Sequence, residues 1–405
     1  MAVSGCRGVL SRAMLGRRGF LGALGRAGTG ALIAAAVPEW ARAASRLATA
    51  PGARAGRAAL DADLIVRNTW PEHYETSIAA LGRAWVTPTQ AFFVRSHFPV
   101  PDVDPESYRL EVTGLVRTPL TLTLPELLAL PAEARTLTLE CAGNGRGLFT
   151  LPSTSGTQWE RGAVGNAAWR GPLLASLLRR AEVQPEAKHV WLEAADRAPL
   201  PDAVPPFLRS IPLEKALDDV ILAHSMNGAA IPKLHGAPLR AIVPGWFGMA
   251  STKWVTRIRV EAAPSDNHFF IRGYRYVHPG EDPTRAAPVQ EMRVKSLITR
   301  PREGARVARG QVSVQGFAWA GPAGVERVEI SSDDGTSWSA ARFVGEDAPG
   351  AWRSWEAQLE AKGAGSRSVM ARATDRNGEA QPLKAEANAS GYGNNSVHRV
   401  AFRVV

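Results

Sequence analysis

The stretch Thr138-Leu139-Glu140-Cys141-Ala142-Gly143-Asn144-Gly145-Arg146 places a cysteine between a predicted strand and a turn. The preceding Leu-Thr-Leu favours a β-strand, and Gly-Asn-Gly favours a turn in which the backbone approaches a bulky group closely. Cys6, the other cysteine, lies in a segment that reads as a cleavable export signal. The mature protein would then hold one thiol and no internal disulfide, so the sulfur of Cys141 is inert, reactive or a ligand. We expect a ligand, and the nearby arginine favours its thiolate form.

Residues 1–43 have the features of a signal peptide. Arg17-Arg18-Gly19-Phe20-Leu21 opens a weakly apolar stretch over 20–37, and Ala41-Arg42-Ala43 provides a small-x-small cleavage signal. Twin arginines followed by x-Phe-Leu resemble the Tat export signal, which carries proteins that have already folded, often around a cofactor. Glycines and Arg26 make the stretch too polar for a stable membrane anchor. The sequence therefore predicts a soluble periplasmic protein that receives a cofactor before export.

Composition indicates a globular protein without a nucleic-acid partner. The 405 residues suffice for two domains, and 45% apolar with 21% charged residues is ordinary for folded chains. The formal net charge is +10, but residues 1–43 hold six arginines against one glutamate, so half of this charge lies in the leader. The remaining +5 is too small an excess to indicate nucleic-acid binding.

The remainder divides into three parts: an N-terminal arm over 44–75, an α+β domain over 76–285 and an all-β domain over 286–405. Residues 44–62 are rich in Ala, Arg and Gly, which is typical of an arm. Within the α+β domain we expect strands over 108–113 and 189–194 and helices over 124–130 and 173–178.

After Pro288 the pattern changes to short alternating strands. Apolar residues alternate with polar ones at Val312 and Val314, and again at Val328 and Ile330, and over 369–373. Turn dipeptides Asp-Gly at 334–335 and Asn-Gly at 377–378 separate such runs. Strands at this spacing favour a β-sandwich of the immunoglobulin type.

Four further segments are rich in cationic and imidazole groups beside glycine and proline: 92–97, 226–240, 243–254 and 271–275. Each by itself is more simply explained as a structural histidine or a solvated charge. Together they indicate an anion site, because arginine offers a planar fork, lysine a point charge and glycine-rich turns their backbone amides. The sequence contains no P-loop, GxGxxG after a strand, CxxC, CxxCH, HExxH or GxSxG motif. Conventional nucleotide, zinc-ribbon, attached-haem and serine-hydrolase sites therefore lack their residues.

These motifs, in order and spacing, resemble the sulfite oxidase family. They are Phe-Phe-Val-Arg-x-His at 92–97, Cys-Ala-Gly-Asn-x-Arg at 141–146, Met-Asn-Gly at 226–228, His-Gly-x-Pro-Leu-Arg at 235–240 and Val-Pro-Gly through Lys-Trp over 243–254. The resemblance runs from about residue 85 to the C-terminus and implies a sulfite-oxidase-type molybdopterin-binding domain followed by an immunoglobulin-like dimerisation domain. It also implies molybdenum held by the pyranopterin dithiolene cofactor, molybdopterin, with no haem in this chain.

The resemblance assigns roles residue by residue. Cys141 matches the thiolate ligand of molybdenum, a soft donor suited to a sulfur-rich site. The cofactor contacts it implies are Phe93, Val94, Arg95, Ser96, His97, Asp196, His235, Arg240, Ser251, Thr252 and Lys253. Ser96 replaces the asparagine more common in the family.

On the substrate side the resemblance implies Arg95, Arg146, Trp159 and a tyrosine. We expect Tyr274 to be this active-site tyrosine, with Tyr276 as the competitor. Gly145 replaces an arginine of vertebrate members, and the loop between Cys141 and Trp159 is about one residue shorter than in some members. Arg353 is a weaker candidate for a further substrate arginine.

The expected function is molybdenum-dependent oxidation of sulfite, or a related small sulfur oxyanion, with electrons passed to an external c-type cytochrome. A homodimer or heteromer is expected. Close alternatives are a sulfane-sulfur dehydrogenase subunit of a thiosulfate-oxidising complex and a sulfoxide reductase, although the β-sandwich counts against the latter. A non-catalytic periplasmic interaction protein is an alternative from another class. A thiol redox enzyme is disfavoured because no resolving cysteine is present.

Overall fold

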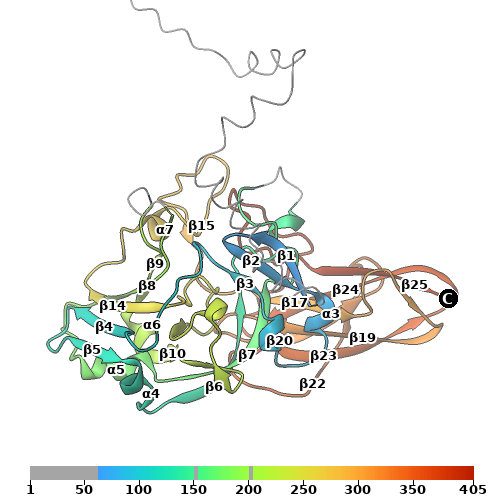
Figure 1. Ribbon diagram of the computed structural model, residues 1–405. Coiled ribbons are helices and arrows are strands. Elements are labelled where there is room, and N and C mark those ends of the chain that lie inside the picture. The colour runs from blue at the N-terminus through green and yellow to red at the C-terminus, as the bar shows by residue number, and fades with distance from the viewer. Residues whose placement is uncertain (1–62, 150–153, 200–203) are drawn as a thin grey trace, which may run out of the picture. The chain divides into compact units, whose positions relative to one another are not determined.

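The computed structural model describes residues 63–149, 154–199 and 204–405 (Figure 1). All of them belong to one compact unit of the chain, Gly56–Val405. The predicted signal peptide, 1–43, and residues 44–62 of the predicted arm lie outside the described residues. No helix among the described residues is long and apolar enough to cross a membrane.

A small antiparallel sheet, in the order β1-β2-β3, opens the described chain. Its elements and neighbours are β1 (Leu64–Thr69), β2 (Glu72–Thr76), α3 (Ile78–Leu81), η1 (Thr89–Ala91) and β3 (Val94–Arg95). The prediction of an arm as far as residue 75 is therefore wrong for residues 64–75. They are held in the domain because buried His73 contacts the Ser96 carbonyl at 2.8 Å, and the Glu75 carboxylate accepts the Gly162 amide at 2.7 Å.

The first domain is built on a five-stranded mixed sheet in the order β5-β4-β14-β8-β9. Its elements are β4 (Arg109–Gly114), β5 (Leu120–Thr123), α4 (Leu124–Leu128), α5 (Leu174–Arg180), β8 (His189–Ala194), β9 (Leu208–Pro212), α6 (Leu213–Asp218) and β14 (Val255–Glu261). β14 runs parallel to β4 and antiparallel to β8. The predicted strands and helices of this region are confirmed within one or two residues. α4 begins where predicted because Thr123 and Glu126 form a reciprocal capping box.

A second sheet, in the order β12-β11-β7-β6, carries the cysteine at its end. The elements of this part are β6 (Glu133–Glu140), η2 (Arg146–Leu148), β7 (Val164–Gly171), β10 (Ile221–Ala223), β11 (Ser225–Met226), β12 (Ala229–Ala230), η3 (Lys233–His235), β13 (Arg240–Ile242), α7 (His268–Ile271), β15 (Arg275–Tyr276) and β16 (Ala287–Pro288). β6 pairs with β7 along its whole length, and the last pair joins Glu140 to Val164. The strand therefore delivers Cys141 to the turn that follows.

The second domain is the predicted β-sandwich. Its sheets have the orders β17-β19-β23-β22 and β18-β25-β24-β20-β21. The strands are β17 (Lys295–Arg300), β18 (Ala305–Val307), β19 (Gly310–Trp319), β20 (Val325–Ser331), β21 (Ser339–Ala340), β22 (Arg342–Val344), β23 (Arg353–Ala361), β24 (Gly365–Asp375) and β25 (His398–Val404). Alternate residues such as Val314, Ile330 and Val369 are buried in one cluster between the sheets. The period-2 alternation thus identified the faces correctly.

The two domains share a buried aromatic junction. The Trp85 indole donates to the Trp352 carbonyl at 3.0 Å, and the Trp352 indole donates to the Trp85 carbonyl at 2.8 Å. The Trp352 ring stacks on Phe317 with centroids 4.3 Å apart. The Trp352 amide also donates to Thr138 Oγ1 at 2.8 Å, so the sandwich contacts the strand that carries the cysteine.

Candidate active site

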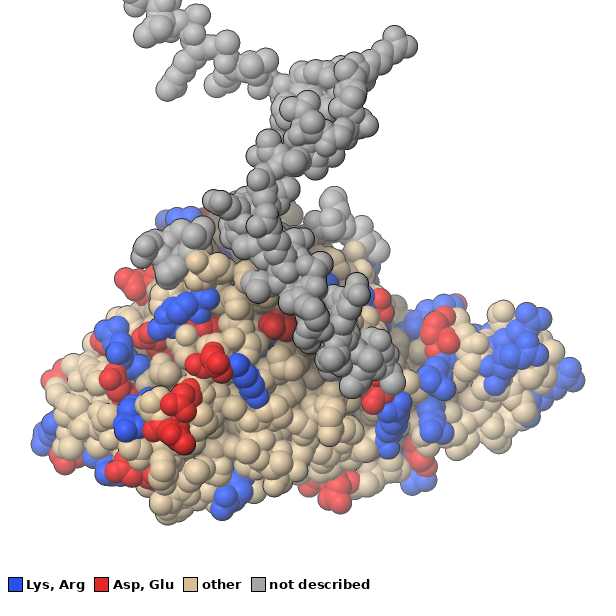
Figure 2. All heavy atoms as spheres, viewed as in Figure 1, with Lys and Arg blue, Asp and Glu red and all other residues tan. Residues whose placement is uncertain are grey.

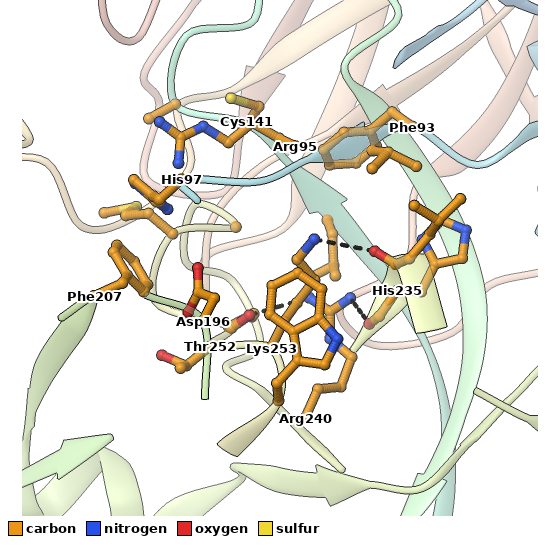
Figure 3. A pocket seen from close by; sticks show the side chains of 18 of the residues that line it. Phe93, Arg95, His97, Cys141, Asp196, Phe207, His235, Arg240, Thr252 and Lys253 are labelled. Carbon is orange, nitrogen blue, oxygen red and sulfur yellow. Dashed lines mark hydrogen bonds between the residues drawn. The ribbon is translucent and has the colours of Figure 1, made fainter. Parts of the chain in front are cut away.

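A pocket with about 700 Å³ of empty volume, including its open mouth, gathers residues from each of the motif segments except Met-Asn-Gly at 226–228. The predicted site residues that line it are Phe93, Val94, Arg95, His97, Cys141, Asp196, His235, Arg240, Ser251, Thr252, Lys253 and Tyr274. Figure 3 shows Cys141 and Arg95 toward one end and Arg240 and Lys253 toward the other. The pocket is therefore elongated between a sulfur donor and a cationic end.

Cys141 is a free, half-buried thiol held by its backbone. Its amide donates to the Ala163 carbonyl at 2.9 Å, and its carbonyl accepts from the Asn144 amide at 2.9 Å. Burial raises the pKa of the Cys141 thiol, and the positive charges of Arg95 and Arg146 oppose this rise without cancelling it. The arginines thus favour the thiolate, as expected, but burial outweighs their effect. A metal ion bonded to sulfur supplies the additional charge that deprotonation needs.

Arg240 and Lys253 form the cationic end. Arg240 donates to the carbonyls of His235 at 2.8 Å and Ser251 at 3.0 Å, and Lys253 donates to Ser96 Oγ at 3.0 Å. Burial lowers the pKa of Arg240 to about 9 and that of Lys253 well below its ordinary value. Within the described chain, neither forms an ion pair with a carboxylate. Buried cations without a counter-ion are costly, so this end is built to receive an anion.

Several polar atoms inside the pocket have no hydrogen-bond partner among the residues that the structure describes. Buried atoms of this kind are Arg95 Nη1, Asp196 Oδ1, Arg240 Nε and Thr252 Oγ1, all on residues that line the pocket. Burial raises the pKa of Asp196 to about 6, although the charge of Lys253 opposes the rise. Buried polar groups of folded proteins are normally satisfied, so four such atoms around one space indicate a polar ligand with several hydrogen-bonding groups.

A pyranopterin dithiolene cofactor fits these features. Its heterocycle offers donors and acceptors for Asp196 and Thr252, its phosphate suits Arg240 and Lys253, and its metal suits the sulfur of Cys141. In the described part of the chain, no cluster of three or more His, Cys, Asp or Glu residues is arranged to hold a metal ion. A metal at Cys141 would therefore take its other ligands from the cofactor.

Tyr274, and not Tyr276, lines the pocket. Its hydroxyl lies 2.6 Å from His97 Nε2, and His97 stacks on Phe207 with centroids 3.8 Å apart. Burial raises the pKa of Tyr274 and lowers that of His97, so both are uncharged near neutral pH. Tyr276 instead packs under the guanidinium of Arg293, at 4.3 Å from its ring centroid.

Four other candidates do not line the pocket. Ser96 is buried and accepts a hydrogen bond from Lys253. Arg146 is turned toward the carbonyls of Ser390, at 2.9 Å, and Thr157, at 3.0 Å, so its guanidinium is already engaged. Trp159 and Arg353 also lie elsewhere. Trp159 is fully buried in a hydrophobic cluster, and Arg353 pairs with Asp347 at 2.9 Å beside another cavity. The substrate-side roles expected of Arg146 and Trp159 stay predictions.

Sequence reasoning missed two residues behind Tyr274. The guanidinium of Arg209 lies 5.2 Å from the Tyr274 ring centroid, and the Tyr392 ring stacks on Tyr274 at 5.2 Å. Arg209 is 4% exposed, and burial lowers its pKa to about 10. Neither residue lies in a segment that the motifs marked. The available signal for Arg209 was an arginine between Leu208 and Ile211 in the short strand β9.

Comparisons with known proteins agree with this geometry. Residues 97–269 match the oxidoreductase molybdopterin binding domain, and residues 286–405 match the Mo-co oxidoreductase dimerisation domain. The chain is 38% identical over 360 residues to the mitochondrial sulfite oxidase of Drosophila melanogaster, covering 83% of this chain and 62% of that protein. It is 33% identical to the sulfite oxidase of Arabidopsis thaliana, covering 82% of this chain and 92% of that protein.

A solved structure extends the likeness to the fold. The sulfane dehydrogenase SoxCD from Paracoccus pantotrophus superposes with a TM-score of 0.74 at 29% identity, covering 92% of this chain and 96% of that chain. The chain spans 62% of the length of the fly protein and 66% of the length of the mouse mitochondrial sulfite oxidase.

Proposed function

Because the chain belongs to the sulfite oxidase family, we propose that it oxidises sulfite to sulfate with a molybdenum–molybdopterin cofactor and passes the electrons to an external c-type cytochrome. Sulfite and water would yield sulfate, two protons and two electrons. Two molecules of cytochrome would each accept one of the electrons. The observation that carries the proposal is the convergence in one pocket of the Cys141 thiol, an Arg95 nitrogen without a hydrogen-bond partner among the described residues, the buried side chain of Arg240 and the half-buried one of Lys253.

Arg95 and Tyr274 would bind and orient the substrate beside the cofactor. When bound, the molybdenum cofactor supplies a two-electron acceptor and the oxygen atom for sulfur. Arg95 would attract and orient the anion, since its guanidinium lines the pocket with Nη1 buried and free of partners among the described residues. Tyr274 Oη lies 2.6 Å from His97 Nε2. With the neutral imidazole protonated at Nε2, His97 would donate to Oη, and the tyrosine hydroxyl would donate its one proton to an oxygen of the substrate. Since this pair is uncharged, it would not compete with Arg95 for the anion.

The test is metal analysis combined with turnover. The enzyme purified from a host that makes molybdopterin should contain about one molybdenum atom per chain and reduce cytochrome c when sulfite is added. Metal-loaded protein that does not oxidise sulfite would refute the proposed substrate. Protein without stoichiometric molybdenum, in which Cys141→Ser leaves partner binding intact, would instead support the non-catalytic interaction protein.

Oxidation of carrier-bound sulfane sulfur is the second candidate function, favoured by the likeness to SoxCD over nearly the whole of both chains. Parallel assays with sulfite and with a sulfane-sulfur carrier protein distinguish the two. A value of kcat/KM at least about tenfold higher for the carrier would identify the sulfane-sulfur activity as the natural one.

The proposal includes export to the periplasm through the Tat pathway and association into a dimer through residues 286–405. Replacement of Arg17-Arg18 by Lys-Lys should leave the enzyme in the cytoplasmic fraction, whereas unchanged periplasmic recovery would contradict Tat export. Light scattering on the purified enzyme should give twice the chain mass, whereas the mass of one chain would contradict the dimer.

A further inference from the structure

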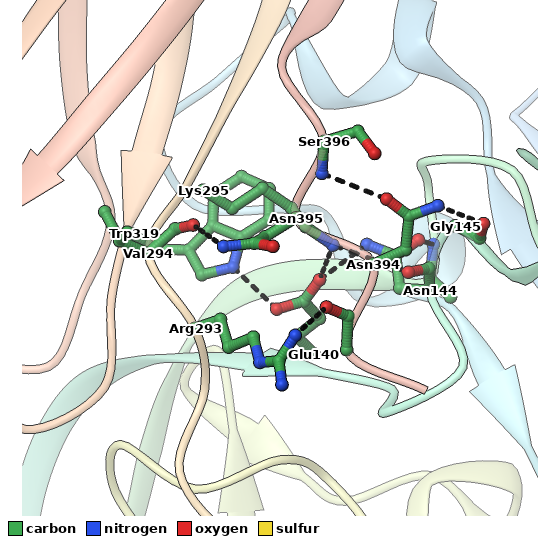
Figure 4. A network of polar contacts seen from close by, with 12 residues as sticks. Glu140, Asn144, Gly145, Arg293, Val294, Lys295, Trp319, Asn394, Asn395 and Ser396 are labelled. Atoms are coloured by element: carbon green, nitrogen blue, oxygen red, sulfur yellow. Dashed lines mark hydrogen bonds and ion pairs between the residues drawn. The ribbon is translucent and has the colours of Figure 1, made fainter. Parts of the chain in front are cut away.

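The carboxylate of Glu140 is the buried group nearest in sequence to the cysteine, and the proposed chemistry does not use it. Glu140 is fully buried and precedes Cys141 directly. Its Oε1 accepts from Lys295 Nζ at 2.5 Å and from Asn144 Nδ2 at 2.9 Å, while its Oε2 accepts from the Trp319 indole at 2.8 Å (Figure 4). Lys295 and Trp319 belong to the C-terminal sandwich. One side chain beside the cysteine is therefore held mainly by the other domain.

The backbone of the same turn is fastened on several sides. The Glu140 carbonyl accepts the Gly248 amide at 2.7 Å, and the Ala142 carbonyl accepts the Gly393 amide at 2.8 Å. Asn394 Nδ2 donates to the Gly145 carbonyl at 2.9 Å. Gly393 and Asn394 also come from the C-terminal sandwich. The end of β6 and the turn that follows it are thus tied to the sandwich by the Glu140 side chain and by the carbonyls of Ala142 and Gly145.

The energetics of this arrangement favour a geometric role. A buried carboxylate is tolerated only when it is paired and hydrogen-bonded, as Glu140 is on both oxygens. Packed apolar residues would stabilise such a junction equally well, so stability alone does not account for a buried ion pair. Directional hydrogen bonds from three donors do restrict the position of the Glu140 side chain. Because Cys141 is the next residue, they also restrict the position of its sulfur.

We propose that Glu140 is a positioning residue, which Lys295 and Trp319 clamp so that the thiol of Cys141 is held where it binds the metal. The C-terminal sandwich then completes the active site of its own chain in addition to any role in dimerisation. The inference rests on the proposed function for its kinetic readout, but the position of the thiol can be measured without the metal or the substrate.

The first test is Glu140→Gln, which removes the charge while keeping the size of the side chain. In folded, molybdenum-loaded enzyme we expect kcat to fall about 100-fold, as for a small misplacement of a reacting group, and KM to change less than about threefold. The control is Glu329→Gln, which removes the partner of Arg372, at 3.0 Å, in the same sandwich away from the turn. This control should keep the wild-type kcat.

The second readout is the rate at which iodoacetamide alkylates Cys141 in cofactor-free protein carrying Cys6→Ser, which leaves one thiol in the chain. Release of the turn should change this rate at least about tenfold in Glu140→Gln, because the exposure and surroundings of the thiolate set its reactivity. The control should react as the parent does. This measurement stays valid if the protein oxidises no sulfite, so failure of the inference and failure of the proposed function are distinguishable.

If Glu140→Gln does not fold, the double variant Glu140→Gln/Lys295→Met replaces it, because it leaves no unpaired charge at the junction. A folded double variant with reduced kcat and an altered alkylation rate supports the clamp. Wild-type kcat with an unchanged alkylation rate, in either variant, overturns it. Loss of molybdenum from a folded variant supports it only if the alkylation rate also changes, and overturns it otherwise.

Discussion

Replacement of Arg95 by glutamine tests the anion-binding role most directly. The Arg95 guanidinium lines the pocket, and its Nη1 is buried with no hydrogen-bond partner among the described residues. Glutamine keeps a hydrogen-bond donor but removes the positive charge. Sulfite, an anion with one or two negative charges, would therefore lose a charge-assisted hydrogen bond from Arg95. Such bonds contribute about 1.5 to 3 kcal/mol. At about 1.4 kcal/mol per factor of ten, KM for sulfite should rise about 10- to 150-fold.

Arg109→Gln is the matched control, because Arg109 is exposed on β4 and donates to the Tyr108 carbonyl at 2.7 Å outside the pocket. Initial rates of cytochrome c reduction over a range of sulfite concentrations, normalised to molybdenum content, give KM and kcat for both variants. If Arg95 acts mainly in binding, kcat should change much less than KM. Equal effects of the two substitutions on KM would refute the substrate role of Arg95.

The other predictions concern the metal ligand, the tyrosine pair and a buried histidine. Cys141→Ser should abolish sulfite oxidation in metal-loaded protein, and full activity would refute the ligand assignment. Tyr274→Phe should lower kcat about 100-fold by removing a donor to the substrate, whereas Tyr276→Phe should have little effect; the reverse order would contradict the assignment of Tyr274. His398 Nδ1 accepts the Ile298 amide at 2.9 Å, and burial lowers the pKa of His398 well below its ordinary value. Below pH 6.5, His398 of the unfolded chain therefore binds a proton that His398 of the folded chain does not. This difference should lower the free energy of unfolding by up to about 1.4 kcal/mol for each unit by which the pH is decreased below 6.5. Urea unfolding at pH 7.5 and 5.5 should show that His398→Gln loses less unfolding free energy between these two pH values than the wild type does. An identical loss in both proteins would contradict the role of His398.

The Arg209–Tyr274–Tyr392 group shows how the two domains meet at the pocket. Arg209 comes from β9 of the first domain, whereas Tyr392 lies in the segment before β25 of the sandwich. Both contact the ring of Tyr274, with centroid distances of 5.2 Å. The orientation of Tyr274 therefore depends on the docking of the two domains, as does the turn that carries Cys141.

Local sequence was sufficient to identify much of the secondary structure, and the resemblance to a family was needed to name the residues of the pocket. Period-2 alternation predicted the sandwich strands, because one face of each strand must be buried. The motifs carried the resemblance to the sulfite oxidase family, and that resemblance implied the lining residues, including Asp196, which lies in none of the motifs. The pattern also led us to expect that Cys141 is a ligand, and this stays a prediction.

Only the tertiary structure decided which groups face the pocket and what holds them. The sequence favoured Tyr274 but kept Tyr276 as a competitor, because the resemblance is loose at this point. Tyr274 has φ of 55°, a left-handed conformation just before β15. Glu140 and Lys295 are 155 residues apart, and Arg146 meets Ser390 across 244 residues. Contacts at such separations are set by how the two domains dock, and no local propensity records that geometry.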